Sequence, residues 1–180
     1  PVETFPPDRW DLIVAINMSS AFHTTRAALI GTLLASIEGA DTNKVAMMCL
    51  IHDIPEARIG DFHKIAARYF PEHSAKERKI FIEQIAHLPE PLQKHWLTLY
   101  DEKHERTSKE GIVAQDADWL ELAVSAREFY NIGYKDTQVW LDKIRVALET
   151  PSAKKLMQEI EQQETYDWAR GLEKMTYTKR

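Results

Sequence analysis

An apolar segment at residues 45–51 leads directly into His52 and Asp53. A helix over about 43–53 would be apolar nearly all round, and such a helix belongs at the centre of a domain rather than on its surface. Burying a carboxylate beside an imidazole costs free energy unless a partner compensates for it. A divalent metal ion is the natural partner, and both side chains can reach one ion near the helix end that Pro55 imposes.

Helical periodicity runs through the rest of the chain, and no stretch alternates convincingly with period two. Glycine is scarce, with 6 residues among 180, which leaves little of the turn punctuation that an all-β chain needs. We therefore predict an all-α fold with short connections and a single core. The expected helices cover residues 8–16, 20–37, 43–53, 61–70, 74–87, 90–105, 109–131, 136–149 and 152–170, and residues 56–60 form a short turn or helix.

Composition excludes several classes of protein. The net charge of −5 argues against a general binder of nucleic-acid polymers or of membranes, whose footprint would be basic. No apolar run reaches the ~18 residues that a bilayer span needs, and no signal peptide is visible, so we expect a cytoplasmic protein.

The single cysteine, Cys49, permits no disulfide within the chain and is expected to be a buried small hydrophobic residue. The mixed charges at 100–106 are interpreted as a solvated helix end.

Three further residues strengthen the metal interpretation of His52 and Asp53. His23 stands early in the preceding predicted helix, and Asp118 lies inside a later one. Glu56 follows His52 by four residues, which is the same helical face if the turn continues. Two histidines and two aspartates suit a borderline or hard divalent ion, namely Mn, Co, Fe, Ni, Zn or Mg.

The order His…His-Asp…Asp resembles the metal motif of the HD-domain phosphohydrolase superfamily. Residues 52–61 (HDIPEARIGD) are similar to the pattern HDxxEaxxGD of the HD-domain 5'-deoxynucleotidases and their relatives. Residues 23–26 (HTTR) resemble the first-ligand segment of the family, and 116–121 (DADWLE) resemble its last-ligand segment. The likeness runs over about 9–134. It implies a single HD domain over 1–180, with C-terminal helices in 135–180 packing on that core.

The resemblance implies that one divalent metal ion is held by His23, His52, Asp53 and Asp118. Asp118 is preferred over Asp116 because the family's ligand directly follows the alanine and precedes the leucine by two residues. Glu56 matches the acid that orients water or moves a proton. Asp61 matches a second acid, which lines the sugar end of the pocket.

Four residues are candidate substrate contacts. Arg9 and Trp10 resemble the pair that, in the deoxynucleotidases, helps hold the phosphate and screens the sugar 2' position. Arg26 and Arg58 are further candidates to steady a phosphate. A helix-start arginine and a core tryptophan are equally good interpretations of Arg9 and Trp10. Arg26 is alternatively a buried partner of Asp61 or Glu56.

The resemblance implies a metal-dependent phosphohydrolase that removes phosphate from a nucleotide, in its concrete form a (deoxy)nucleoside 5'-monophosphate. Two alternatives stay open: a nucleoside triphosphate phosphohydrolase of the same fold, and a non-catalytic HD module that binds a nucleotide. Phe22 stands where the family usually has Glu before the first histidine, which leaves the substrate open. Relatives are commonly dimers built through helices, so a homodimer is expected.

Overall fold

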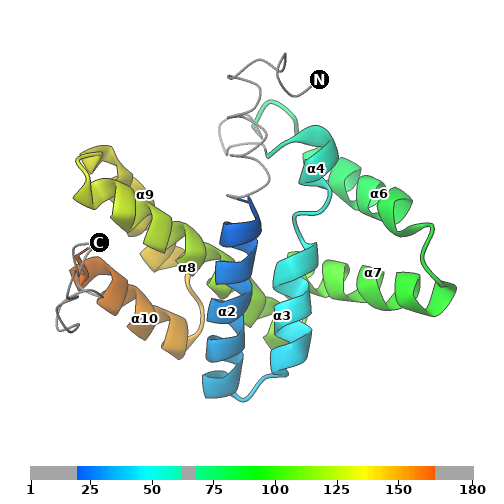
Figure 1. Cartoon of the computed structure of the whole chain (residues 1–180), viewed down its shortest axis with the longest axis horizontal. Helices are drawn as coiled ribbons and strands as arrows, with labels where there is room; N and C mark the ends of the chain where they lie inside the picture. Colours follow the sequence, from blue (N-terminus) through cyan, green and yellow to red (C-terminus); the bar gives the residue numbers. More distant parts are fainter. Residues whose placement is uncertain (1–19, 62–67, 165–180) are drawn as a thin grey trace, which may run out of the picture.

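The computed structural model of the chain describes residues 20–61 and 68–164 (Figure 1). These residues form helices joined by short connections, with no strand among them, which confirms the prediction of an all-α fold. The order of elements is α2 (Ser20–Glu38), α3 (Thr42–Ile51), α4 (Glu56–Ile59), α6 (His73–Ile85), α7 (Glu90–Glu105), α8 (Lys109–Asn131), the 3₁₀ helix η3 (Lys135–Thr137), α9 (Gln138–Ala147) and α10 (Pro151–Gln162).

The centre of the fold is formed by α2, α3 and α8, which all contact one another. The helices α2 and α3 form a hairpin in front of α8 (Figure 1). They approach closely at the buried residue Gly31 of α2, where an added Cβ would lie 2.9 Å from Val45 Cγ1, 3.0 Å from Cys49 Sγ and 3.4 Å from Ala117 Cβ. The close contact of the three helices therefore depends on the missing side chain at residue 31.

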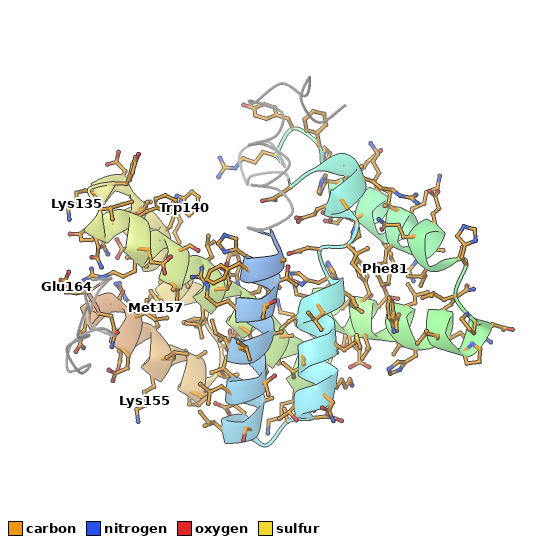
Figure 2. All side chains as sticks on the ribbon, viewed as in Figure 1. Phe81, Lys135, Trp140, Lys155, Met157 and Glu164 are labelled. Carbon is orange, nitrogen blue, oxygen red and sulfur yellow. The ribbon has the colours of Figure 1, made fainter. Side chains whose placement is uncertain are left out.

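Two groups of helices flank this centre, with α6 and α7 on one side and η3, α9 and α10 on the other (Figure 1). Phe81 of α6 is fully buried and stacks on Tyr100 of α7, with ring centroids 4.4 Å apart. Figure 2 shows Phe81 in this right-hand group and Met157 in the opposite group. Met157 is also fully buried and fixes α10 to the core.

Helix caps set the turns between the central elements. Asp41 caps α3, and its carboxylate accepts hydrogen bonds from the amides of Asn43 and Lys44 at 2.9 and 3.1 Å. Gly39 precedes this cap with φ of 67°, a left-handed conformation that glycine adopts at little cost. The hydroxyl of Ser108 caps α8 in the same way by accepting from the amide of Gly111. The chain therefore turns within a few residues before α3 and before α8, the two helices that bring His52 and Asp118 together.

The expected helix boundaries differ from the observed ones mainly toward the C-terminus. The helix expected over 152–170 ends at Gln162, because Gln163 has extended backbone and its carbonyl accepts hydrogen bonds from Arg127 Nε and Asn131 Nδ2. The helix expected over 136–149 begins instead as the 3₁₀ turn η3 and ends at Ala147. The expected helix over 8–16 and most of the one over 61–70 lie outside the described residues. Within the described residues, no helix has the length and apolar character needed to span a membrane.

Candidate metal centre

His52 lies at the C-terminal end of α3, where its amide donates to the Met48 carbonyl at 3.2 Å. The side chain is buried, at 6% exposed. Its Nδ1–H donates to the carbonyl oxygen of Cys49 at 3.0 Å. Because Nδ1 carries this proton, the neutral ring presents a lone pair on Nε2, which is the form of histidine that binds metals. Helix α3 thus buries the ring and fixes which nitrogen is available.

Two carboxylates converge on that nitrogen. His52 Nε2 lies 2.9 Å from Asp53 Oδ1 and 3.4 Å from Asp118 Oδ1. Ligand atoms of the three residues all lie within 4.8 Å of one another. Asp53 follows His52 in the turn after α3, whereas Asp118 comes from the middle of α8. The contact between α3 and α8 therefore assembles one nitrogen and two oxygens from segments 65 residues apart in the chain.

The residues present fit a divalent metal ion. Although Asp53 Oδ1 is close, His52 Nε2 makes no hydrogen bond of acceptable geometry with any part of the chain that the structure describes. Leaving this buried nitrogen without a partner is costly, and a proton held on it beside the two carboxylates is one way to meet that cost. An ion coordinated by this nitrogen and the two carboxylates would relieve that cost, and one imidazole with two carboxylates is a donor set that several first-row metals accept.

Asp118 is held from its other side by two residues that the sequence did not single out. Its Oδ2 accepts hydrogen bonds from Lys103 Nζ at 3.2 Å and from Gln115 Nε2 at 3.1 Å. Burial opposes ionisation of Asp118, but Lys103 and His52 outweigh it and keep the pKa of this carboxyl well below its usual range. Lys103 itself is only 4% exposed, so the interpretation of 100–106 as a solvated helix end is wrong at this residue. The alternation of charges in residues 100–106 gave no sign that Lys103 of α7 faces Asp118 of α8.

Asp116, the acid that was set aside in favour of Asp118, has a structural position. It is 1% exposed and accepts hydrogen bonds from the amides of Glu149 and Thr150 at 3.0 and 2.7 Å. The hydroxyl of Thr150 also donates to it, at 2.7 Å. Asp116 therefore fixes the entry to α10, whereas Asp118 faces His52.

The two carboxylates also decide the ionisation of His52. Burial and the nearby Lys103 both lower the pKa of its ring, but Asp118 and Asp53 outweigh them and raise it to about 9. Without a metal ion the ring is therefore protonated at neutral pH. A metal ion must displace that proton in order to bind.

Glu56 and Asp61 lie in the segment that follows Asp53, and the charges of Asp53 and Asp61 act on Glu56. Glu56 begins α4 and is partly buried, and burial, followed by the charges of Asp53 and Asp61, raises its pKa to about 8. Asp61 is exposed and follows Gly60, whose φ of 76° ends α4. Glu77 of α6 is a further acid that sequence reasoning missed. Its pKa is also raised, first by burial and in part by Asp53 and Asp61.

His23, the fourth expected ligand, lies against a different carboxylate. Its Nδ1 is 2.5 Å from Glu121 Oε1, and its side chain is 46% exposed. It is not among the described residues whose ligand atoms converge within 4.8 Å. A carboxylate on Nδ1 is a common way to orient a metal-binding histidine, because it leaves Nε2 directed away from that carboxylate. The role of His23 as a ligand stays a prediction.

Arg26 belongs to the same network as His23. Its Nη2 lies 2.5 Å from Glu121 Oε1 and 2.5 Å from Ser125 Oγ, and its Nη1 lies 3.4 Å from Glu128 Oε1. The partners of Arg26 are thus acids of α8 rather than Asp61 or Glu56.

The other expected substrate contacts are placed as follows. Arg58 is half-exposed, with Nη1 3.3 Å from Glu83 Oε2. Phe22 is 59% exposed. The Arg26 guanidinium lies over its ring, with Cζ 5.0 Å from the ring centroid. Arg9 and Trp10 lie outside the described residues.

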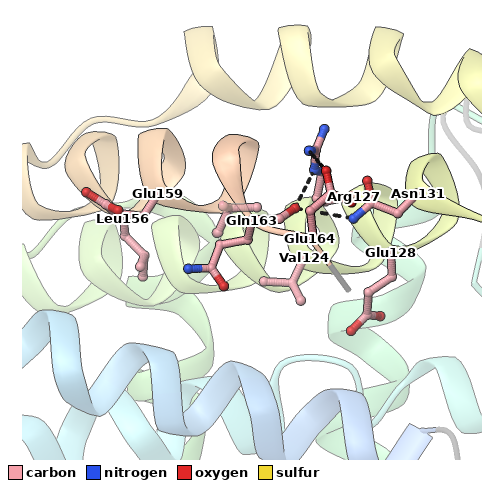
Figure 3. A pocket seen from close by; sticks show the side chains of 9 residues that line it. Val124, Arg127, Glu128, Asn131, Leu156, Glu159, Gln163 and Glu164 are labelled. Carbon is pink, nitrogen blue, oxygen red and sulfur yellow. Dashed lines mark hydrogen bonds and ion pairs between the residues drawn. The ribbon is translucent and has the colours of Figure 1, made fainter. Parts of the chain in front are cut away.

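Two cavities lie away from the three converging residues. One, of about 400 Å³, lies between α8 and α10 and is crossed by the hydrogen bonds from Arg127 and Asn131 to the Gln163 carbonyl (Figure 3). The other, of about 340 Å³, is lined by His23 and Glu121 together with the half-exposed Trp140 of α9. Figure 2 shows Trp140 on the α9 side of the molecule. The second cavity therefore adjoins the His23 network.

Comparison with known proteins identifies the family. The sequence profile of the HD domain matches residues 13–161, which is most of the chain. The chain therefore belongs to the HD-domain family, whose members are typically metal-dependent phosphohydrolases. The candidate metal site of His52, Asp53 and Asp118 agrees with this membership.

Solved structures share the fold. A conserved hypothetical protein from Pyrococcus furiosus superposes with a TM-score of 0.63 and 24% identity, over 79% of this chain and 83% of that chain. The PH0347 protein from Pyrococcus horikoshii OT3 superposes with a TM-score of 0.62 and 21% identity, over 78% and 81%. At these identities the likeness establishes the arrangement of helices alone.

Curated proteins match only locally. A stretch of 30 residues, or 17% of this chain, is 70% identical to D-beta-hydroxybutyrate dehydrogenase of Cupriavidus necator, and it covers 12% of that protein. A stretch of 28 residues, or 16% of this chain, is 54% identical to the same enzyme of Rhizobium meliloti (strain 1021), and it covers 11% of it. The chain thus spans a small fraction of these relatives, and the match carries no argument about activity.

Proposed function

We propose that this HD-domain protein hydrolyses the phosphate monoester of a nucleotide, in the concrete form a (deoxy)nucleoside 5'-monophosphate, with one divalent metal ion as cofactor. The observation that carries the proposal is the convergence of His52 Nε2, Asp53 Oδ1 and Asp118 Oδ1. The protonable Glu56 stands beside them. The finer assignment to the 5'-deoxynucleotidases rests on the resemblance of residues 52–61 and 116–121 to that subfamily.

The metal would be held by His52, Asp53 and Asp118, with His23 as the fourth ligand. A divalent ion supplies charge neutralisation for a phosphoryl group and acidifies a coordinated water. Asp118 presents Oδ1 to the centre because Lys103 and Gln115 hold its other oxygen. Asp53 lies at the exposed edge of the site, with 48% of its side chain accessible, so a substrate can approach from its side.

Glu56 is the acid of the reaction. In the metal-free protein, burial, more than the charges of Asp53 and Asp61, raises its pKa to about 8; burial persists when a metal ion is bound, so Glu56 would carry a proton to the nucleoside oxygen as the ester bond breaks. A leaving alkoxide is a strong base, so protonating it as the bond breaks lowers the barrier. Asp61, exposed just after α4, would accept a hydrogen bond from the sugar.

Arg58 is better placed than Arg26 to bind the phosphate of a substrate. Arg58 pairs with Glu83 at a half-exposed position, where an ion pair has little net strength and can be exchanged for a phosphate. Arg26 is only 15% exposed and is held by Glu121 and Glu128, so a bound phosphate would have to displace a buried pair. Arg58 is therefore the better candidate, alongside Arg9 and Trp10.

The test is release of phosphate from deoxy- and ribonucleoside mono- and triphosphates by chelated protein to which Mn, Co or Mg is returned. Turnover of monophosphates that depends on metal and is abolished by Asp53→Ala supports the proposal. Asp136→Ala, at an exposed position in η3, is the matched control and should keep full activity. Turnover of triphosphates alone would move the substrate within the family. Absence of any turnover, with metal bound, would leave a nucleotide-binding module.

A further inference from the structure

A lysine is buried directly behind the candidate metal centre. The side chain of Lys103 is 6% exposed, and its Nζ lies 3.2 Å from Asp118 Oδ2. Taking an ammonium group out of water costs several kcal/mol unless it is paired. Neither the metal motif nor the expected substrate contacts include this residue. A cation in such a place changes the electrostatic potential that a bound metal ion or phosphate experiences.

The two oxygens of Asp118 have separate tasks. Oδ2 accepts from Lys103 and also from Gln115 Nε2 at 3.1 Å. Oδ1 is directed to the other side, 3.4 Å from His52 Nε2. Because both lone-pair directions of Oδ2 are taken by donors, only Oδ1 remains for a metal ion. The carboxylate is therefore prepared for coordination through one oxygen.

We propose that Lys103 is a positioning residue that holds Asp118 to one-oxygen coordination and adds a positive charge to the loaded centre, which favours an anionic substrate. The proposal rests on the metal centre proposed above. The carboxylates of Asp53 and Asp118 balance the charge of a divalent ion, and Lys103 adds one positive charge that offsets the nearby acids, among them Asp61. A phosphoryl group therefore meets a less negative potential at the centre than it would without Lys103, in a protein whose net charge is −5.

This arrangement has opposite consequences for the two ligands. Lys103 repels a metal ion bound to Asp118, and it attracts a phosphate bound to that metal. Removing its charge should therefore strengthen the binding of metal and weaken the binding of phosphate. A lysine that only supported the fold would behave differently, because its loss would weaken both.

The test measures binding rather than turnover, by calorimetric titration of chelated protein with Mn alone and then of Mn-loaded protein with inorganic phosphate. Lys103→Met removes the charge and the donor, Lys103→Gln removes only the charge, and Lys103→Arg keeps both. We expect the Lys103→Met and Lys103→Gln variants to bind Mn about tenfold more tightly and phosphate about tenfold more weakly than the unmodified protein, and the Lys103→Arg variant to bind both about as the unmodified protein does. Lys94→Met, which removes an exposed lysine of α7, is the matched control and should change neither.

The proposal is overturned if Lys103→Gln binds Mn no more tightly than the unmodified protein, or if it binds phosphate equally well. Circular dichroism of each variant shows whether the helices form, and Lys103→Gln and Lys103→Arg decide the question if Lys103→Met does not fold. Failure of the unmodified protein to bind Mn would instead overturn the metal centre itself. The two failures are thus distinguished by the first titration.

Discussion

Asp116 and Asp118 stand two residues apart on α8 and face different parts of the molecule. Asp116 accepts from the amide of Thr150 at 2.7 Å, whereas Asp118 Oδ1 lies 3.4 Å from His52 Nε2. Two steps along a helix rotate the side chain by about 200°, so the neighbours point to nearly opposite sides. On one helix, Asp116 therefore fixes the entry to α10 and Asp118 faces the candidate metal centre.

This division predicts opposite effects of two matched variants. Asp116→Asn should lower the free energy of unfolding by about 2 kcal/mol, because the charged acceptor of three buried hydrogen bonds is lost, and should leave Mn affinity unchanged. Asp118→Asn should weaken Mn binding by about a hundredfold or more, because a neutral amide is a poor ligand. Urea denaturation and Mn titration measure both quantities. Loss of Mn binding in Asp116→Asn would contradict the assignment.

The ionisation of His52 predicts that metal affinity depends on pH. Since Asp118 and Asp53 raise the pKa of its ring to about 9, a proton competes with metal throughout the neutral range. We expect Mn affinity to rise about tenfold per pH unit from pH 6 to 8 and to level off above about 9. Titrations at several pH values in a non-coordinating buffer measure this slope, and an affinity that is flat from pH 6 to 8 would contradict the prediction.

The same shift affects the metal-free protein. A ring whose pKa is raised on folding stabilises the fold fully below its unfolded pKa, near 6.5, and this stabilisation is lost as the pH rises through about 9. The melting temperature of chelated protein should therefore fall between pH 6.5 and 9. Saturating Mn should remove most of this fall, because the metal takes the place of the proton.

Glu56→Gln separates catalysis from stability. The folded pKa of Glu56, about 8, lies above its unfolded value of 4.5, so the protonated form stabilises the fold below pH 4.5 and this stabilisation is lost as the pH rises through about 8. At pH 9 the glutamine should make the metal-free protein more stable by about 1 kcal/mol, less than the shift alone implies because solvent screens a partly buried group.

Turnover should fall by about 10² to 10⁴ in Glu56→Gln, because the proton donor is removed. Phosphate release and thermal melts at pH 5 and pH 9 measure the two effects. Glu105→Gln, at an exposed position of α7, should change neither. Full activity in Glu56→Gln would exclude Glu56 as the acid.

Much of the fold was readable from the sequence because its signals are local. The helices over 90–105 and 109–131 begin and end where the pattern placed them, since Pro89 and Ser108 mark their starts. His52 and Asp53 stand out because an apolar helix ends in them. Lys103 and Gln115 were missed because their importance arises from the contact between α7 and α8, and no local pattern reports that contact.

The helix ends that were placed wrongly have the same explanation. Gln163 leaves the helical conformation where its carbonyl is bound by Arg127 and Asn131, two residues more than 30 positions earlier. The pairing of Arg26 with Glu121 and Glu128 likewise joins α2 to α8 and carries no signature in either helix alone. Tertiary contacts, rather than propensity, decide these positions.

Gly31→Ala tests the close approach of the central helices. The new Cβ would lie 2.9 Å from Val45 Cγ1 and 3.0 Å from Cys49 Sγ, so the helices must separate. We expect a loss of about 1–3 kcal/mol in the free energy of unfolding. An alanine at the exposed Gly133, where no atom lies within 4 Å, probes the separate effect of a positive φ and should cost about 1 kcal/mol. Equal or greater stability of Gly31→Ala would show that the helices have room to spare.

The most direct test of the metal centre is the number of Mn ions bound per chain, measured by electron paramagnetic resonance of free Mn during titration of chelated protein. We expect one tightly bound ion, lost in Asp53→Ala and in His52→Ala and kept in Asp136→Ala. An unmodified protein that binds no Mn, Co or Zn, or an Asp53→Ala protein that binds Mn as tightly as the unmodified one, would contradict it.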